Sequence, residues 1–147
     1  MRISDLLKVK GSGVITAQSH ITMRQVLKQM IDNKVGSVVV LDKDNNPIGI
    51  FTERDTIRMV YKQDGRDWQS KAISEFMTTE IMIGVPDDDV EYVMALMTDN
   101  RFRHVPIMSE GKLIGLISIG DIVKSLLKNI KIENRYLSDY ISGKYPA

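Results

Sequence analysis

The sequence contains one structural pattern twice, and this repeat constrains the fold more than any other feature. The helical spacing of apolar residues over 23–30 returns 67 positions later at 90–97, and the strand-like run 37–41 returns at 104–108 with the same offset. A third matching pair, residues 49–55 and 115–121, lies 66 positions apart, because the turn before this segment is one residue shorter in the second half. Since the length differences fall in loops, the pattern indicates a tandem repeat.

Each copy of the repeat predicts a strand, a helix, two strands and a second helix. In the first half we expect strands at 14–16, 37–41 and 48–51, with a helix after the first and after the third. In the second half, residues 81–83 take the place of the first strand. A unit of about 60 residues is marginal alone, because it buries only about 60% of its unfolded surface. We therefore expect an α/β fold of the α+β type, in which two three-stranded sheets pack face to face around a pseudo-two-fold axis.

Composition excludes several functional classes. The chain has 20 basic and 19 acidic side chains, and this balance gives no support for binding to nucleic acid. It has no cysteine, so disulfides, thiolate metal sites and cysteine nucleophiles are excluded. The first residues lack the apolar segment of a signal peptide, and no apolar run approaches the roughly 20 residues that span a bilayer. We expect a soluble, cytoplasmic protein without a membrane or nucleic-acid partner.

No catalytic constellation is visible in the sequence. The chain has two histidines and no serine–histidine–carboxylate arrangement, so we predict no catalytic residues. The acidic run 87–89 precedes a helix, where carboxylates serve as caps and partners of the helix dipole. We therefore expect no metal site and no required cofactor.

The strongest chemical feature lies where the third strand of each half meets the following helix. Residues 49–55 read Gly-Ile-Phe-Thr-Glu-Arg-Asp, and residues 115–121 read Gly-Leu-Ile-Ser-Ile-Gly-Asp. In each, a hydroxyl residue and a carboxylate stand near the first helical turn, where unpaired N–H groups and the helix dipole favour a phosphate. The same residues would also make a capping box, with the hydroxyl residue as N-cap and the carboxylate at N3. Both interpretations can hold together.

The repeat, the paired Gly-x-x-Thr/Ser-x-x-Asp motifs and the segment 103–107 (Arg-His-Val-Pro-Ile) together resemble a pair of cystathionine beta-synthase (CBS) domains, known as a Bateman module. The resemblance extends over about residues 3–128, and the tail 134–143 is similar to the ends of stand-alone bacterial and archaeal members. On this basis we expect a first CBS motif at 3–62, an inter-repeat segment at 63–72, a second motif at 73–128 and a helical tail at 129–147.

The resemblance implies a non-catalytic regulatory sensor that binds an adenosine compound between the repeats. AMP is the first candidate, followed by ATP, ADP or NAD(H), and S-adenosylmethionine is a further family ligand. The resemblance also implies a homodimer. We expect the module to report ligand binding, by a change of shape or of partner affinity, either to a separate effector protein or through its own oligomeric state. The residues implied to bind the nucleotide are Thr16, Ser37, Val38, Thr52, Arg54, Asp55, Ile83, Arg103, His104, Val105, Pro106, Ser118 and Asp121.

Within this implied site the residue types divide the ligand between them. The carboxylates Asp55 and Asp121 would accept hydrogen bonds from the ribose hydroxyls, since a carboxylate accepts from two vicinal donors. The hydroxyl residues of the motifs, together with Arg54, Arg103 and His104, would bind phosphate. Backbone near the first strand and the start of the second strand of each half would hold the adenine.

The two motifs differ in charge. The first carries Glu53-Arg54 where the second carries Ile119-Gly120, so only the first has a cation inside the motif. We therefore expect the first site to bind a phosphorylated ligand more tightly. A ligand-free scaffold or oligomerisation module is an alternative function, and a nucleotide hydrolase is a third.

The tail extends the last helix beyond what the repeat needs. Apolar side chains continue at intervals as far as Ile141, and Gly143 suits the end of a helix. Two interpretations stay open for this helix, which are packing on its own module and packing against a second copy of the chain.

Overall fold

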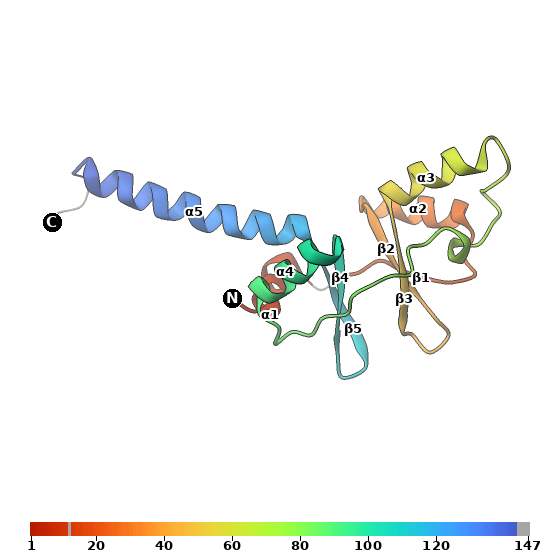
Figure 1. Cartoon of the computed structure of the whole chain (residues 1–147), viewed down its shortest axis with the longest axis horizontal. Coiled ribbons are helices and arrows are strands. Elements are labelled where there is room, and N and C mark those ends of the chain that lie inside the picture. The colour runs from red at the N-terminus through yellow and green to blue at the C-terminus, as the bar shows by residue number, and fades with distance from the viewer. Residues whose placement is uncertain (12, 144–147) are drawn as a thin grey trace.

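The computed structural model describes residues 1–11 and 13–143, and it places two halves side by side (Figure 1). The first half contains a three-stranded sheet in the order β1-β2-β3. Strand β1 (Thr16–Gln18) runs parallel to β2 (Ser37–Leu41), and β2 pairs antiparallel with β3 (Pro47–Thr52). This topology confirms the strand–helix–strand–strand–helix pattern predicted for the first repeat.

Alternation along the strands explains how the first sheet is covered on both faces. Val38, Val40 and Phe51 point to one face, where they pack against the helices α2 (Met23–Asn33) and α3 (Glu53–Gln63). Val39, Leu41 and Ile50 belong to a separate buried cluster that includes Leu116 of the other half. Successive side chains of a strand point to opposite faces, so this β-branched strand is buried on both sides.

The second half repeats the arrangement with one strand fewer. Helix α4 (Val90–Asn100) precedes β4 (His104–Ser109), which pairs antiparallel with β5 (Lys112–Ser118), and α5 (Ile119–Ile141) follows. The two sheets meet through the cluster that contains Leu116, which confirms the predicted packing of sheet against sheet.

The strand predicted at 81–83 does not form, and Gly84 makes only an isolated parallel bridge to Ile107. In the first half, the N–H of Val39 donates to the carbonyl of Ile15 at 3.0 Å. The residue equivalent to Val39 is Pro106, which has no N–H to donate. The equivalent hydrogen bond is therefore lost, and the expectation of a third strand in this sheet is wrong.

The two halves exchange short segments. Helix α1 (Ile3–Lys10) precedes the first sheet, yet its buried Ile3 and Leu6 belong to the core of the second half. Conversely, the 3₁₀ helix η1 (Ile73–Glu75) places Ile73 in the core of the first half. Each core thus contains residues from the segment that leads into the other repeat, so neither core is built from one half alone.

Helix α5 extends far from the rest of the molecule (Figure 1). Its start packs on the second half through the buried Ile122 and the half-buried Leu126, whereas its later apolar side chains are exposed. The interpretation that the tail packs on its own module therefore holds only for the first turns of α5. In the described part of the chain, no helix combines the length and apolar character needed to cross a bilayer.

Candidate functional site

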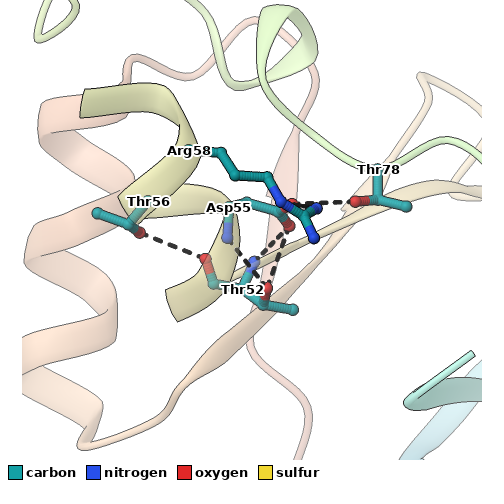
Figure 2. A network of polar contacts seen from close by, with 5 residues as sticks. All are labelled: Thr52, Asp55, Thr56, Arg58 and Thr78. Atoms are coloured by element: carbon teal, nitrogen blue, oxygen red, sulfur yellow. Dashed lines mark hydrogen bonds and ion pairs between the residues drawn. The ribbon is translucent and has the colours of Figure 1, made fainter. Parts of the chain in front are cut away.

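The first motif forms the capping box that its sequence predicts. Thr52 is the N-cap of α3, and its Oγ1 accepts a hydrogen bond from the N–H of Asp55 at 3.4 Å. In return, Oδ2 of Asp55 accepts from the N–H of Thr52 at 3.0 Å and from its hydroxyl at 3.2 Å (Figure 2). This reciprocal pairing satisfies donors that the first helical turn would otherwise leave free.

Asp55 also has partners outside the capping box. Its Oδ1 accepts from the hydroxyl of Thr78 at 3.1 Å and lies 3.6 Å from Nη1 of Arg58 (Figure 2). Asp55 is 6% exposed and is the buried charged residue of the described chain. Because both carboxylate oxygens are engaged, the side chain joins β3, α3 and the segment around Thr78 into one structure.

The second motif repeats the capping box with a different set of outside partners. Oγ of Ser118 accepts from the N–H of Asp121 at 3.1 Å, and Oδ2 of Asp121 accepts from the N–H of Ser118 at 2.8 Å. Nζ of Lys10 donates to the same Oδ2 at 2.5 Å and to the carbonyl of Leu116 at 2.6 Å. Among the described residues, only Oδ2 of this carboxylate has a hydrogen-bond partner, and the Asp121 side chain is 27% exposed.

Strand pairing brings further predicted residues to the two helix starts. Ser37 lies opposite Thr52 in the β2–β3 ladder, and His104 lies opposite Ser118 in the β4–β5 ladder. The N–H of Ile119 donates to the carbonyl of Arg103 at 2.9 Å, which fixes the start of β4 beside the start of α5. The predicted hydroxyl, carboxylate and imidazole groups of the second repeat are therefore neighbours.

The electrostatic surroundings of His104 link it to both carboxylates. Burial lowers the pKa of His104 below its ordinary value of 6.5, and the charge of Lys10 adds to this effect. Asp121 and Asp55 act in the opposite direction, and both are close enough to affect the same imidazole. His104 is therefore mainly neutral near pH 7, but it lies where an additional anion would favour its protonation.

Asp121 has the opposite balance. Burial acts to raise the pKa of Asp121, but the hydrogen bonds from Lys10 and Ser118 outweigh it, and the pKa lies below its ordinary value of 3.8. The carboxylate is therefore ionised at neutral pH and can accept hydrogen bonds from hydroxyl donors.

The other residues predicted to bind the nucleotide differ in burial. Val38, Val105 and Pro106 are buried, so only their backbone could contact a ligand. Thr16 is half-buried in β1, and Ile83 is exposed outside any strand.

The cations that pair with the two motif carboxylates lie outside the predicted set. Arg54 and Arg103 are exposed, and among the described residues neither makes an ion pair. Arg58, one turn later than Arg54, is the cation beside Asp55. Lys10, which lies outside the second motif, gives Asp121 a cation that the motif sequence itself does not contain.

Sequence reasoning missed Lys10, Arg58 and Thr78. The position of Arg58 three residues after Asp55 is a local signal that could have indicated the ion pair. Lys10 gives no such signal, because 111 residues separate it from Asp121 and only the exchange of α1 brings them together.

Comparison with known proteins assigns the chain to a family. The model of the CBS domain matches residues 4–62 and 73–128. The CBS domain-containing protein CBSX3, mitochondrial, of Arabidopsis thaliana is 34% identical over 97% of this chain and 73% of its own length. The crystal structure of the CBS-domain containing protein ATU1752 from Agrobacterium tumefaciens has a TM-score of 0.77 and 37% identity, covering 85% of this chain and 98% of that chain.

The protein belongs to the CBS domain family and contains a pair of CBS repeats. CBS domain pairs are regulatory modules, and small CBS-domain proteins are generally non-catalytic. The CBS domain pair of protein MJ0100, solved in complex with 5′-methylthioadenosine and S-adenosyl-L-methionine, has the same fold at 23% identity. Its TM-score is 0.74, and the match covers 88% of this chain and 98% of that one.

Proposed function

We propose that the protein is a regulatory sensor that binds an adenosine ligand beside the start of α5, between the two halves. The observation that carries the proposal is the cluster of Lys10, His104, Ser118 and Asp121 at one helix N-terminus. In this cluster the carboxylate of Asp121 can accept hydrogen bonds from ribose hydroxyls, and the side chains of Lys10 and His104 can bind phosphate. The adenosine ligands of MJ0100, which shares the fold, support this ligand class.

The geometry favours the second motif over the first as the tighter site. Asp55 is buried and uses both oxygens, so a ribose could bind it only by displacing Thr78 or Arg58. Asp121 is more exposed and has one oxygen without a described hydrogen-bond partner. This ranking reverses the one expected from the motif sequences alone, because Lys10 supplies the missing cation.

AMP is the ligand that we propose first, followed by ATP, ADP or NAD(H). Its ribose hydroxyls would donate to Asp121, and its phosphate would accept from Lys10 and from protonated His104. The N-terminus of α5 adds the positive end of a helix dipole.

The same contacts suggest how binding is reported. Lys10 ends α1 and holds the carbonyl of Leu116 in β5 as well as Asp121 in α5. A phosphate that draws Lys10 away from this carboxylate would loosen the connection between α1 and α5. We propose that a homodimer contact or a separate effector protein senses that change, and that the chain has no catalytic activity of its own.

Thermal unfolding with a panel of nucleotides tests the proposal. A ligand at a hundredfold its dissociation constant stabilises the folded state by about 2.7 kcal/mol, which raises Tm by roughly 5 to 11 °C for a chain of this size. We expect such a shift with at least one adenosine compound and none with the matched guanosine compound. No shift with any adenosine compound at millimolar concentration would favour the scaffold function, and cleavage of the nucleotide would favour the hydrolase.

A further inference from the structure

Helix α5 carries an apolar row that its own molecule does not cover. The helix has 23 residues, and Ile122 is the one that the described structure buries. Most helices in proteins owe their stability to packing of an apolar face rather than to intrinsic propensity. The outer turns of α5 therefore have an apolar face that requires a partner.

The spacing of this row is that of a coiled coil. Its members alternate by four and three residues, so they fill successive d and a positions of a heptad. We call these residues the α5 seam, and they are Val123, Leu127, Ile130, Asn134, Leu137 and Ile141. The five apolar members are between 44% and 83% exposed, and Asn134 is exposed as well.

We propose that α5 is a dimerisation helix that pairs in parallel and in register with α5 of a second copy of this chain. The single polar residue of the seam identifies the occupant. An asparagine side chain has both a donor and an acceptor, so Asn134 can pair with Asn134 of the partner subunit across a two-fold axis. One asparagine at an a position specifies register and oligomeric state in coiled coils.

The alternative orientation is less favourable. An antiparallel pair places a positions against d positions, so Asn134 would face Ile130 or Leu137 of the partner subunit. Its amide would then be covered by apolar groups without a hydrogen-bond partner, which costs free energy. The parallel arrangement also places Lys131, at an e position, beside Leu126 of the partner subunit rather than beside a like charge.

The size of the seam is consistent with a specific but modest interface. The exposed parts of the five apolar seam residues amount to roughly 500 Å² per helix, so a pair would cover about 1,000 Å², the lower limit for a specific interface. The capping box of Ser118 and Asp121 and the packing of Ile122 fix the first turn, so the helix is already nucleated before it pairs.

A groove that overlaps the seam at Val123 and Leu127 offers a competing occupant that the test must distinguish. The groove has a volume of about 610 Å³ and is lined partly by cations of α5, which are Lys124, Lys128, Lys131 and Arg135. Such a basic surface could attract an anionic lipid surface. Its charges lie outside the seam, however, whereas a second copy covers the seam itself.

The test compares two substitutions on the full-length chain by sedimentation equilibrium. Ile130→Lys places a charge in the seam, and Ile132→Lys makes the same change two residues away at a similarly exposed position outside the seam. We expect a dimer for the unchanged chain and for Ile132→Lys, and an increase of at least about tenfold in the dimer dissociation constant for Ile130→Lys. AMP binding at the second motif should not differ between the two variants, so failure of this proposal is distinguishable from failure of the proposed function.

Orientation is tested by cross-linking, for which the absence of cysteine from the chain provides a clean background. Leu137→Cys should form a disulfide-linked dimer on mild oxidation, because a parallel pair places the two residues opposite each other, whereas Ile132→Cys should not. A monomeric unchanged chain would contradict the proposal, whether or not it binds vesicles of anionic lipid. Equal effects of the two lysine substitutions, or equal cross-linking of the two cysteine variants, would contradict it as well.

Discussion

Lys10 and Asp121 form a hydrogen-bonded ion pair with Nζ and Oδ2 2.5 Å apart, although 111 residues separate them in the sequence. The pair connects the last residue of α1 to the first turn of α5, and the same ammonium group donates to β5. The first and last helices of the module therefore meet at the helix start where the sequence predicts a phosphate site. This contact supplies a cation to the second motif, which has none of its own, and it supports our proposal that this motif is the tighter site.

Replacing Lys10 should separate ligand binding from folding. In Lys10→Met the apolar stem is kept, and the loss of a partly exposed ion pair should cost no more than about 1 kcal/mol in the free energy of unfolding. We expect affinity for AMP to fall at least about tenfold, and affinity for adenosine, which lacks the phosphate, to change little. Isothermal titration calorimetry measures both, with Lys8→Met on the same helix as the control. Equal losses for AMP and adenosine would show that Lys10 does not contact phosphate.

The two motif carboxylates should differ in their importance for stability. Asp55→Ala removes a capping partner and leaves the hydroxyl of Thr78 without its acceptor, so it should reduce the free energy of unfolding by about 1–3 kcal/mol. Asp121→Ala should cost less, because its carboxylate is more exposed. Urea denaturation of both variants checks the order. A larger loss for Asp121→Ala would contradict the structural role given to Asp55.

Gly49 and Gly115 occupy equivalent positions in the two motifs but should tolerate alanine differently. A Cβ at Gly49 would lie 2.9 Å from the backbone carbonyl oxygen of Thr78, which accepts a hydrogen bond from the N–H of Ile50. The three atoms nearest to a Cβ at Gly115 all belong to the Leu7 side chain, which can rotate away. We expect Gly49→Ala to lower Tm clearly more than Gly115→Ala, as differential scanning calorimetry can measure. Equal decreases in Tm would argue against this difference in packing.

His104 predicts a pH dependence in two parts. Its pKa is lowered in the folded chain, so below pH 6.5 the unfolded chain binds a proton that the folded chain does not, and stability falls as pH falls toward the folded pKa. A bound phosphate has the opposite effect, because it favours the protonated imidazole. Binding of AMP should therefore be accompanied by uptake of a proton, and the affinity for AMP should increase as pH decreases from 8 to 6.

The comparison with His104→Asn isolates this contribution. The phosphate of AMP titrates equally in both experiments, so the ratio of the two affinities reports the imidazole alone. We expect the ratio of wild-type to variant affinity to increase toward pH 6, by no more than about tenfold per pH unit. A ratio that stays constant across this range would show that His104 does not bind the phosphate.

Local patterns in the sequence predicted much of the structure. The capping boxes of Thr52 with Asp55 and Ser118 with Asp121 could be predicted because each depends on residues three positions apart. The double burial of β2 follows from its β-branched run, and the face-to-face sheets follow from the repeat. These features need only short-range spacing and the requirement to cover apolar faces.

The remaining features depend on contacts between distant segments. The missing strand near Ile83 results from a proline on the neighbouring strand, so the local apolar run was misleading. The cation of the second site comes from α1, which packs on the half that follows rather than the half in which it lies in the sequence. The spacing of residues along the sequence does not indicate this exchange, because the exchange depends on which half the apolar face of α1 packs against.

The most direct test of the account is calorimetric titration of AMP into the unchanged chain and into Asp121→Asn. The asparagine keeps an oxygen to accept from the N–H of Ser118, so the cap is preserved while the charge and one acceptor are lost. We predict saturable binding to the unchanged chain and at least about tenfold weaker binding to the variant, with a smaller effect of Asp55→Asn. Binding that is unaffected by Asp121→Asn, or no saturable binding of AMP, ATP, ADP or NAD(H) at millimolar concentration, would contradict the proposed site.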